Sequence, residues 1–361
     1  MTMGRQGQHT ISDIAAAVGV SKASAARVLG GYGYSSKDVQ ARVTAAATEL
    51  NYSPSRIART MRSGRSTTIG FVCADISDAF FSIAMRGICD VANASGYQVF
   101  VTSSDDSLDK ERSATDAMDS HQVDGLILTP ISVQQHAHLD RLGDAGLAIV
   151  TLDRQLKGGS IDSVVADNQQ ATVNAVRRLI DMGHGRIGFL VSTQPEEPPR
   201  LRRSASGLRL DGPSRPSLDR TRGYLQAFRE ADLPVDRELV GFVPQDEPNR
   251  RPKEVRRMMA LANPPTAIFT GDSYMTRSAF VTLGADGFII PRDVSLVGFD
   301  DLEWTTLVSP QVTVVVQQAY EMGRVAAEQL FTRIRGEESP PVRALVPTRY
   351  VDRHSVSEPH R

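Results

Sequence analysis

Three aspartates each stand at the end of a short apolar run of the kind that forms a buried strand. They are Asp153, Asp272 and Asp300. In parallel α/β sheets, residues at the carboxyl ends of the strands surround the ligand crevice. Carboxylates accept paired hydrogen bonds from hydroxyl groups, and aromatic rings stack on the apolar faces of sugars. These residue types favour binding of a neutral sugar or polyol.

No set of residues for catalysis emerges from the sequence. The chain has no Gly-x-Ser-x-Gly motif, no phosphate-binding loop and no cluster with the spacing of metal ligands. Dispersed carboxylates do not define a glycosidase pair, because that assignment needs a known separation between them. We therefore expect no enzyme activity, no cofactor and no metal.

The composition is typical of a soluble globular protein with room for a small head and two further lobes. The 361 residues are 40% hydrophobic, and no run of about 18 apolar residues predicts a membrane span. Residues 1–9 are polar and lack the apolar core of a signal peptide. Cys73 and Cys89 lie in apolar segments without a Cys-x-x-Cys spacing, as expected of thiols in a reducing compartment. We expect a cytoplasmic protein.

The net charge of −1 hides two oppositely charged parts. Residues 1–66 hold nine Lys or Arg and three Asp or Glu, a net charge of +6, so the remainder carries −7. A basic head supplies sequence-independent affinity for phosphates. An acidic body keeps the other faces of the protein off nucleic acid.

Beyond residue 66, apolar runs of strand length alternate with amphipathic segments of helix length. This rhythm predicts parallel sheets joined by right-handed crossovers. The predicted strands include 68–74, 97–103, 124–129, 147–152, 187–191, 239–243, 266–270 and 294–298. The predicted helices include 80–95, 109–120, 168–182, 219–232, 252–262 and 274–286.

Residues 10–29 have the pattern of a helix-turn-helix. An apolar stripe at helical spacing ends at Gly19, which can adopt the positive φ of a sharp turn. Ser12 and Ser21 are the expected caps of the first and second helices, and a third helix is predicted over residues 37–50. In such a motif the second helix enters the DNA major groove. An ordinary helical hairpin is the alternative.

Three motifs occur in a fixed order along the chain. They are Ile-Ser-Asp-Ile-Ala-x-x-x-Gly-Val-Ser at 11–21, Leu-Asn-Tyr-x-Pro-x-x-x-Ala-Arg at 50–59 and Gly-Phe-Asp-Asp at 298–301. On these motifs the chain resembles transcription regulators of the lac repressor and purine repressor family, over almost all of its length. The set is highly specific when taken together.

The resemblance implies an all-α helix-turn-helix head followed by a two-lobed α/β domain with parallel sheets, like that of periplasmic sugar-binding proteins. The implied divisions are a DNA-binding domain at 1–53, a hinge helix at 54–65 and an effector-binding and dimerisation domain at 66–361. Lobe 1 would hold about 66–165 and 317–345, and lobe 2 about 166–316 and 346–361. The effector would lie between the lobes.

The resemblance also assigns DNA contacts. Lys22, Ala23 and Arg27 are the expected base-reading residues of the second helix, with Ala23 limited to apolar contact such as a thymine methyl. Met61 stands where the family places an apolar wedge, usually Leu, that enters the minor groove and kinks the DNA. The remaining expected contacts, mainly to phosphates, are Thr10, Ser21, Ser24, Ser36, Tyr52, Ser55, Arg56 and Arg59.

Asp78 and Phe80 lie in a segment that resembles the family's Asn-Pro-Phe-Phe, and Arg220 stands where the family places an effector-binding arginine. The expected effector contacts are Asp78, Phe80, Asp153, Arg220, Asp272, Asp300 and Trp304. Asp272 departs from the usual Asn, which alters the hydrogen-bond pattern there. Trp304 serves either as a sugar platform or as a packing residue.

Residues 191–211 depart from the family, which reaches its Arg-x-x-Gly element much sooner. The segment contains about twenty extra residues rich in Pro, Arg and Ser. We expect a mobile surface loop. The alternative is a lid whose arginines bind an anionic or larger ligand.

The sequence therefore predicts a cytoplasmic, homodimeric, DNA-binding transcriptional regulator, in the first place a repressor controlled by a carbohydrate effector. Two symmetric heads would read a palindromic operator in double-stranded DNA. Three alternatives stay open: a regulator that depends on a nucleoside or purine co-repressor, a plain sugar-binding protein, and an architectural DNA-binding protein without an effector.

Overall fold

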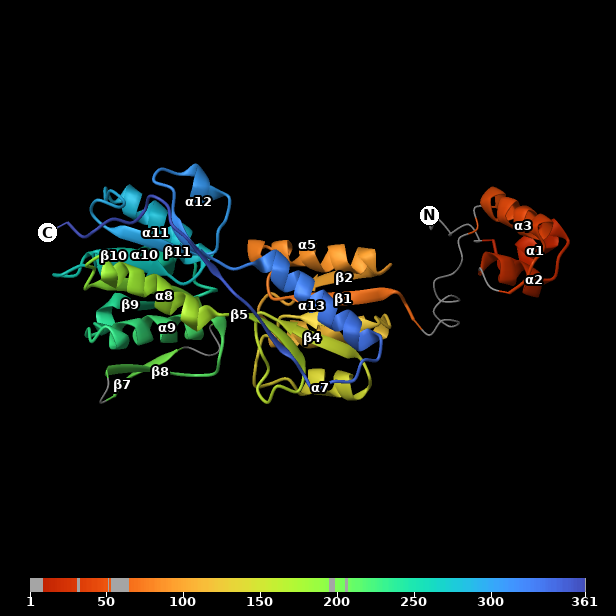
Figure 1. Ribbon diagram of the computed structural model, residues 1–361, viewed down its shortest axis with the longest axis horizontal. Helices are drawn as coiled ribbons and strands as arrows, with labels where there is room; N and C mark the ends of the chain where they lie inside the picture. Colours follow the sequence, from red (N-terminus) through yellow and green to blue (C-terminus); the bar gives the residue numbers. More distant parts are fainter. Residues whose placement is uncertain are drawn as a thin grey trace, which may run out of the picture. The chain divides into compact units, whose positions relative to one another are not determined.

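The computed structural model describes residues 9–30, 33–50, 52, 65–194, 199–204 and 207–360. In it the chain separates into two compact units, residues 1–66 and 67–361 (Figure 1). The expected hinge helix lies outside the described residues, and so do Ser55, Arg56, Arg59 and Met61.

The described residues of the first unit form three helices, each of which begins after a hydroxyl residue that caps it. They are α1 (Ile11–Val18), α2 (Lys22–Leu29) and α3 (Lys37–Glu49). The side-chain oxygens of Thr10, Ser21 and Ser36 each accept a backbone N–H of the following first turn, which has no partner within the helix. The prediction that Ser12 caps the first helix is wrong. Thr10 caps α1 because it forms a capping box with Asp13, whose carboxylate accepts the Thr10 N–H at 2.7 Å.

A small apolar core closes this unit. Gly19 has φ 69°, the left-handed conformation that the sharp turn between α1 and α2 requires. Arg42 of α3 donates to the Val18 carbonyl at the end of α1 and so joins the third helix to the first. The buried core residues are Ile14, Ala15, Val18, Ala25, Val43 and Ala47.

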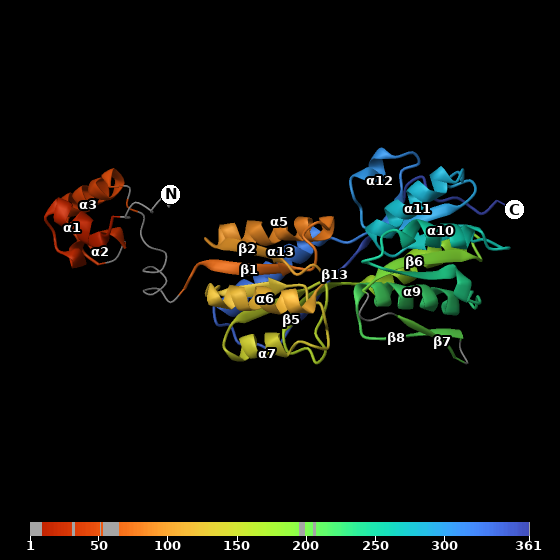
Figure 2. The same ribbon diagram turned by 180° about the vertical axis from the view of Figure 1, so that it is seen from behind.

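The second unit has two lobes, each built around one twisted sheet (Figures 1 and 2). The sheet of lobe 1 has the order β13-β5-β4-β3-β1-β2, and all neighbouring strands are parallel. Its strands are β1 (Thr68–Cys73), β2 (Gln98–Ser103), β3 (Gly125–Leu128), β4 (Ala148–Leu152), β5 (Asp162–Ala166) and β13 (Arg343–Val346). Its helices are α5 (Ala79–Ala94), α6 (Leu108–Ser120), α7 (Ala137–Asp144) and α13 (Ala319–Ile334).

The sheet of lobe 2 has the order β14-β12-β11-β10-β6-β9, and only β14 runs antiparallel to its neighbour. Its strands are β6 (Ile187–Thr193), β9 (Val240–Pro244), β10 (Ala267–Thr270), β11 (Ser295–Phe299), β12 (Thr313–Val316) and β14 (Arg349–Val351). The helical segments are α8 (Asn168–Asp181), α9 (Pro216–Glu230), η1 (Arg237–Leu239), α10 (Arg250–Met259), α11 (Ser273–Ala285) and α12 (Trp304–Leu307).

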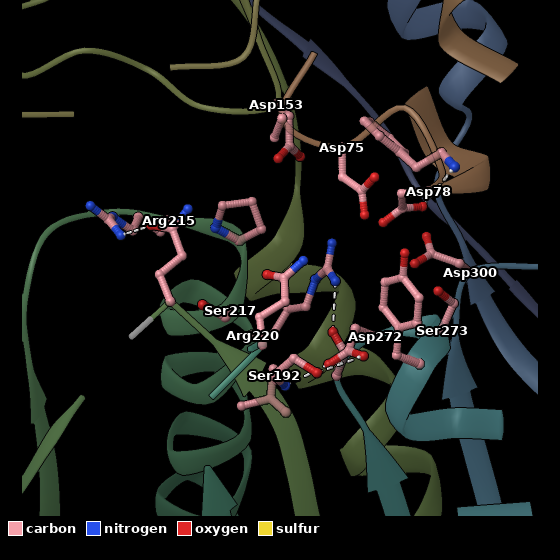
Figure 3. A pocket seen from close by; sticks show the side chains of 18 of the residues that line it. Asp75, Asp78, Asp153, Ser192, Arg215, Ser217, Arg220, Asp272, Ser273 and Asp300 are labelled. Carbon is pink, nitrogen blue, oxygen red and sulfur yellow. Dashed lines mark hydrogen bonds between the residues drawn. The ribbon is translucent and has the colours of Figure 1, made fainter. Parts of the chain in front are cut away.

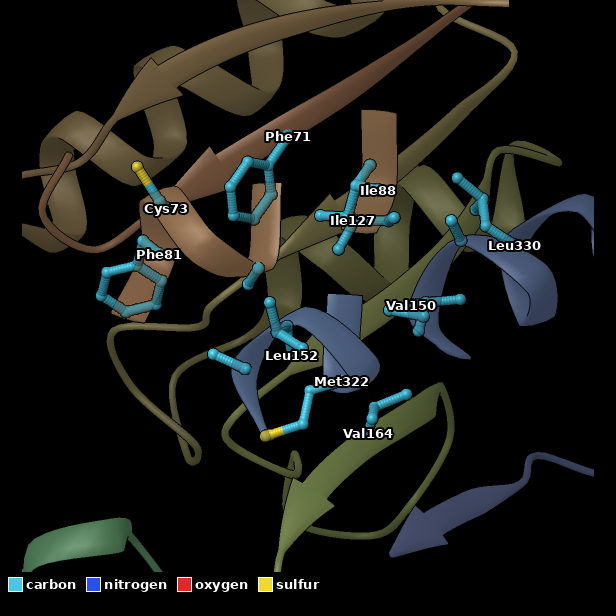
Figure 4. Packing of buried hydrophobic residues seen from close by; sticks show 14 of the residues in the cluster. Phe71, Cys73, Phe81, Ile88, Ile127, Val150, Leu152, Val164, Met322 and Leu330 are labelled. Atoms are coloured by element: carbon cyan, nitrogen blue, oxygen red, sulfur yellow. The ribbon is translucent and has the colours of Figure 1, made fainter. Parts of the chain in front are cut away.

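Helices cover both faces of each sheet, which explains why the central strands are apolar along their whole length. In lobe 1, α5 and α13 bury one face around Phe71, Ile127 and Met322 (Figure 4). On the other face, α6 and α7 contribute Met118 and Leu139. In lobe 2, α8 and α9 cover one face and α10 and α11 the other. The predicted fold class, a helical head followed by a two-lobed parallel α/β domain, is confirmed.

The chain crosses between the lobes at three places: from β5 to α8, from β12 to α13 and from β13 to β14. Two hydrogen bonds join these crossings. Thr348 N–H donates to the Asp167 carboxylate at 2.8 Å, and the Gln318 amide donates to the Pro347 carbonyl at 2.8 Å. The crossings therefore form one hydrogen-bonded connection rather than three separate linkers.

The segment expected as a surface loop, residues 191–211, contains an antiparallel hairpin instead. Its strands are β7 (Arg200–Ser204) and β8 (Gly207–Asp211). Leu201, Leu208 and Leu210 pack against the core of lobe 2, whereas Arg209 on the opposite side of the hairpin is exposed. The alternation of leucine and arginine is the pattern of a strand with one buried face, so the hairpin is packed onto lobe 2.

Candidate functional site

A cavity between the two lobes collects polar residues that follow the strands (Figure 3). Six carboxylates and three guanidinium groups line it. They belong to Asp75, Asp78, Asp106, Asp153, Arg154, Arg215, Arg220, Asp272 and Asp300. The cavity lies at the carboxyl ends of the parallel strands, where α/β folds bind ligands.

Arg220 of α9 is fixed within lobe 2 before any ligand binds. Its Nε donates to Asn168 Oδ1 at 2.8 Å, and its Nη1 donates to the Gly271 carbonyl at 2.6 Å. The guanidinium carbon lies 3.6 Å from the centre of the Phe299 ring, a cation–π contact. The side chain is buried. Its position is therefore preorganised, and its charge acts on Asp153 and Asp300.

Asp153 and Asp300 occupy matching places in the two lobes. Asp153 follows β4 and Asp300 follows β11, and both adopt left-handed backbone conformations with φ of 71° and 70°. Each N–H donates to the next strand of its sheet, to Val164 and Val315 respectively, at 2.8 Å. Burial raises the pKa of both carboxyls, and the Arg220 guanidinium opposes that shift.

Asp272 uses its carboxylate within the protein. It caps α11 by accepting the Met275 N–H at 2.9 Å. It also accepts the Ser192 N–H at 2.6 Å and the Ser192 hydroxyl at 3.1 Å. These donors hold the end of β6 against the start of α11, so the Asp at this position joins two elements of lobe 2.

Asp78 caps α5 by accepting the Phe80 N–H at 2.9 Å. Burial raises the pKa of Asp78 to about 7, and the neighbouring carboxylates of Asp300, Asp272 and Asp75 add to the shift. Figure 3 shows the side chains of Asp75, Asp78 and Asp300 turned toward one another at one end of the cavity. Carboxylates of both lobes thus meet there.

A hydrogen bond crosses the cavity near its other end. The Gln194 amide of lobe 2 donates to Asp106 Oδ1 of lobe 1 at 3.1 Å. Arg215 donates to the Gln194 oxygen from the lobe 2 side, and Arg154 Nη2 lies 3.6 Å from Asp106 Oδ1 on the lobe 1 side. Gln194 and Arg215 stand on either side of the hairpin in sequence, so the extra segment begins and ends at this contact.

Two expected aromatic contacts have different positions. Phe80 lines the cavity and packs edge to face with Phe81, with ring centres 5.1 Å apart. Trp304 lies in α12, outside the cavity lining, and packs edge to face on Phe280 at 5.8 Å. Of the two roles left open for Trp304, the structure places it in the packing position.

Sequence reasoning missed several cavity residues. Arg154 and Tyr274 directly follow the recognised Asp153 and the start of α11, so a list of all polar residues after each predicted strand would include them. Gln317 follows β12, which was not among the predicted strands. Gln194 and Arg215 depend on the path of the extra segment. The arginines of the hairpin itself do not line the cavity, so the lid alternative finds no support in the described residues.

Two other polar residues singled out by their sequence motifs have structural roles within lobe 2. The two ring nitrogens of His184 lie 2.8 Å from Thr266 Oγ1 and from the Ser357 carbonyl, and burial lowers the pKa of this imidazole. Asp301 forms a bidentate ion pair with Arg353 at 2.8 and 2.7 Å. Both residues hold the C-terminal segment against the lobe.

In the head, the expected base-reading residues lie on the accessible side of α2. Lys22 and Ala23 are exposed, and Ser24 and Arg27 are half-buried. The Ser24 hydroxyl lies 2.9 Å from that of Ser21. Tyr52 packs against the apolar core of the head.

Among the described residues, none of the helices is both long and apolar enough to cross a membrane. Within the same residues, no group of three or more His, Cys, Asp or Glu is arranged to hold a metal ion.

Comparisons with known proteins define the class of this chain. Residues 10–55 match the family described as bacterial regulatory proteins, lacI family, and residues 176–356 match the periplasmic binding protein-like domain. Catabolite control protein A of Priestia megaterium is 31% identical over 354 residues, covering 98% of this chain and 97% of that protein. The transcriptional regulator KdgR of Bacillus subtilis is 27% identical and covers 97% and 98%. The chain belongs to the lacI family of bacterial regulatory proteins.

Solved structures agree with this assignment. The transcriptional regulator CelR in complex with cellobiose is 25% identical, with a TM-score of 0.69 over 96% of this chain and 99% of that one. The lac repressor dimer bound to operator and the anti-inducer ONPF has a TM-score of 0.81 at 21% identity, over 97% and 100%, and shares the fold. The predicted function, a DNA-binding transcriptional regulator controlled by a small molecule, is confirmed at the level of the family, which consists of regulators rather than enzymes.

Proposed function

We propose that this chain is a repressor that binds a palindromic operator as a homodimer and is controlled by a sugar or related polyol held between its lobes. In this proposal residues 1–53 bind DNA, 54–65 form the hinge, and 66–361 bind the effector and dimerise. Lobe 1 comprises 66–165 and 317–345, and lobe 2 comprises 166–316 and 346–361.

The observation that carries the effector assignment is the buried Arg220 among carboxylates of both lobes. Its Nε and Nη1 are occupied by Asn168 and Gly271, so the guanidinium has a fixed direction. Around it, carboxylates supply acceptors for hydroxyl groups, and Phe80 supplies an apolar surface. A polyhydroxylated ligand has the donors that these acceptors need. CelR, whose solved complex contains cellobiose, supports a carbohydrate in this class of cleft.

The caps of the head support the proposed DNA contacts. Thr10, Ser21 and Ser36 place three helix N-termini at the surface, where N–H groups and the helix dipole attract phosphates. Lys22 and Ala23 extend from the first turn of α2, the part of a recognition helix that reaches base edges. Substituting Lys22 should therefore weaken operator binding more than binding to unrelated DNA.

Exposed apolar side chains support a dimer that uses both lobes. Ile83 of α5, Val281 of α11 and Leu307 of α12 are 42%, 62% and 75% exposed. In this proposal these side chains belong to the dimer interface, because contiguous exposed apolar patches mark protein–protein interaction sites. Light scattering on the full chain should give twice the mass of one chain, and Ile83→Asp together with Val281→Asp should reduce it to one.

Control follows from two arrangements of the lobes with different operator affinities. An effector shifts their balance only by its differential affinity for the two. The lobe contact between Gln194 and Asp106 is present in the arrangement described here. An inducer should lower operator affinity, and a co-repressor should raise it.

The test measures operator binding by fluorescence anisotropy, with the operator selected from random duplexes by the full chain. Sugars, polyols and nucleosides are added in turn. We expect a sugar or polyol to change the operator Kd, Arg220→Ala to abolish that change, and the exposed Arg229→Ala on the same helix to preserve it. Arg220→Lys keeps the charge but not the paired contacts, and should respond weakly. A normal response in Arg220→Ala would refute the cleft assignment, and a response to nucleosides alone would refute the carbohydrate class.

A further inference from the structure

We propose that the effector of this regulator carries a protonated amine, which binds at the end of the cavity formed by Asp75, Asp78, Asp300 and Gln317. The inference rests on the proposed function, because it assigns ligand chemistry to the same cleft. It names a subclass of ligand: a polyhydroxylated compound with one ammonium group.

Acidic and basic groups are unevenly distributed in the cavity. Six aspartates and three arginines line it, so the acidic groups outnumber the basic ones by three. Arg154 lies 3.6 Å from Asp106 and 3.7 Å from Asp153. Arg220 acts on Asp153 and Asp300. Neither of these two arginines is among the charges that act on Asp78.

The carboxylate of Asp78 has few favourable contacts within the protein. Its Oδ1 accepts the Phe80 N–H, and no other hydrogen bond to it is found among the described residues. The charged groups that act on it, Asp300, Asp272 and Asp75, are all negative, and together with burial they raise its pKa to about 7. Asp272 differs from Asp78, because both of its carboxylate oxygens accept hydrogen bonds from the protein. Asp78 therefore has no counter-charge among the described residues.

The hydrogen-bonding groups at the Asp75 and Asp78 end of the cavity are mainly acceptors. The Gln317 amide nitrogen donates to Asp300 Oδ1 at 2.7 Å. The Gln317 Oε1 atom is a buried acceptor that has no hydrogen-bond partner among the described residues. Asp75 Oδ1 already accepts from the Ser77 N–H and hydroxyl. The open groups are thus acceptors.

An ammonium group matches this set in both charge and donors. It carries one positive charge and three N–H donors and accepts nothing. A hydroxyl would supply one donor and leave the carboxylates uncompensated, and a ligand carboxylate or phosphate would be repelled. Asp75 and Asp78 belong to lobe 1, and Asp300 and Gln317 follow strands of lobe 2. An ammonium between them would therefore attract both lobes and favour the closed arrangement.

Isothermal titration of the full chain at pH 6.5 tests the inference with matched ligands. Glucosamine and galactosamine are compared with glucose and galactose, which replace the amine by a hydroxyl, and with the N-acetyl derivatives, which remove the charge. We expect an amino sugar to bind at least about 10-fold tighter than both of its counterparts, a difference of about 1.4 kcal/mol. Asp78→Asn should remove that preference. The exposed Asp109→Asn on α6 is the matched control and should retain it.

Four results would overturn the inference: no binding by either amino sugar, equal or tighter binding of the hydroxyl counterparts, an undiminished preference in Asp78→Asn, or loss of the preference in Asp109→Asn. Calcium chloride is titrated separately, and competition of calcium with the amine for wild type but not for Asp78→Asn would support the same cationic position. If a neutral sugar changes operator binding through Arg220 while no amine is preferred, the proposed function stands and this inference fails. If no compound of any class changes operator binding, the effector function itself fails.

Discussion

The two lobes have the same plan and differ in where they place charge. Their sheets follow the same order, β13-β5-β4-β3-β1-β2 and β14-β12-β11-β10-β6-β9, so each strand of lobe 1 has a counterpart in lobe 2. Asp153 and Asp300 end matching strands in the same left-handed conformation. The two walls of the cavity therefore share a backbone plan, and they differ in the side chains that this plan presents.

The residues that follow these aspartates show the difference. In lobe 1, Arg154 follows Asp153 and lines the cavity, where its Nη1 donates to the Pro130 carbonyl at 3.0 Å. In lobe 2, Asp301 follows Asp300 and pairs with Arg353 outside the cavity lining. Lobe 2 takes its cavity cations from α9 instead, as Arg220 within the helix and Arg215 directly before it. The same backbone therefore presents different charges on the two walls of one cleft.

The largest expected effect comes from the helix pairs, which the two lobes share. A Cβ on Gly323 of α13 would overlap the Ala84 carbonyl oxygen of α5, and a Cβ on Gly223 of α9 would overlap that of Gln169 in α8. Because backbone cannot move aside cheaply, Gly323→Ala and Gly223→Ala should each lower the free energy of unfolding by about 3 kcal/mol. Urea unfolding of the full chain measures both.

Gly185→Ala is the control for this pair, because a Cβ there meets nothing within 4 Å. It should change the free energy of unfolding by less than about 0.5 kcal/mol. If only one of the two helix-pair substitutions lowers the free energy of unfolding, the two lobes do not depend on the same helix packing.

The hairpin is present in lobe 2 alone, and Leu210 tests whether it is part of that lobe. Leu210 is 6% exposed and belongs to the lobe 2 core. Leu210→Ala should therefore cost about 2–3 kcal/mol of unfolding free energy. The exposed neighbour Arg209→Ala should cost little. Equal, small effects in urea unfolding would mean that the segment is a detached loop, as the sequence first indicated.

Asp272 and Asp78 both cap helices, but replacement by Asn should lower the stability of the protein at Asp272 and raise it at Asp78. Asp272 accepts hydrogen bonds from Ser192 and Met275 with both oxygens. Asp272→Asn replaces one oxygen by an NH2 group that faces a donor, so stability should fall by about 1–3 kcal/mol. Asp78 has one N–H donor and like charges around it, so Asp78→Asn should instead raise the melting temperature of the unliganded protein, by about 2–4 °C at pH 8. Asn keeps the cap in both cases.

The pH dependence of stability tests whether the effect of Asp78→Asn arises from charge. Its pKa is about 7 in the folded state against 3.8 for an ordinary aspartate. The folded state holds this proton more tightly than the unfolded state, so the contribution of Asp78 to stability falls as the pH rises from about 4 to about 7. The gain from Asp78→Asn should therefore disappear near pH 4. Thermal unfolding from pH 4 to 8 measures it, and a gain that is independent of pH would rule out a charge effect.

Much of this arrangement could be predicted from local sequence, and the rest depends on distant contacts. The central strands are continuous apolar runs, and Asp153 and Asp300 were found because they end such runs. β5 was not among the predicted strands, since it begins with the buried Asp162. That carboxylate is tolerated because Arg333 of α13 pairs with it at 2.8 and 2.9 Å, a partner 171 residues away. Local patterns do not contain such information.

The cavity between the lobes was likewise predicted in part. Asp78, Phe80 and Asp272 line it as their places after strands predict. Gln317 was not predicted because it follows β12 (Thr313–Val316), which was not among the predicted strands. Asp272 lines the cavity, yet its oxygens serve Ser192 and Met275, which only the folded arrangement reveals. Sequence therefore identifies which residues reach a cleft more readily than what each one does there.

The smallest expected effects concern a short repeat that the lobes share. Gly143 and Gly146 end α7 in lobe 1, and Gly284 and Gly287 end α11 in lobe 2. The second glycine of each pair has a positive φ, 93° and 86°, and donates its N–H to the first, at 2.9 and 3.2 Å. This is the left-handed residue that ends a helix, where alanine is strained. The first glycine is helical, and a Cβ there meets nothing within 4 Å.

The same change should therefore stabilise at one position of each pair and destabilise at the other. Gly143→Ala and Gly284→Ala should each raise the free energy of unfolding by about 0.5 kcal/mol, because alanine loses less backbone entropy in a helix. Gly146→Ala and Gly287→Ala should each lower it by about 1 kcal/mol. Urea unfolding of the four variants compares the lobes directly. Matching signs in both would show that the repeat is an equivalent helix end, and opposite signs between the lobes would show that the likeness stops at the sheets.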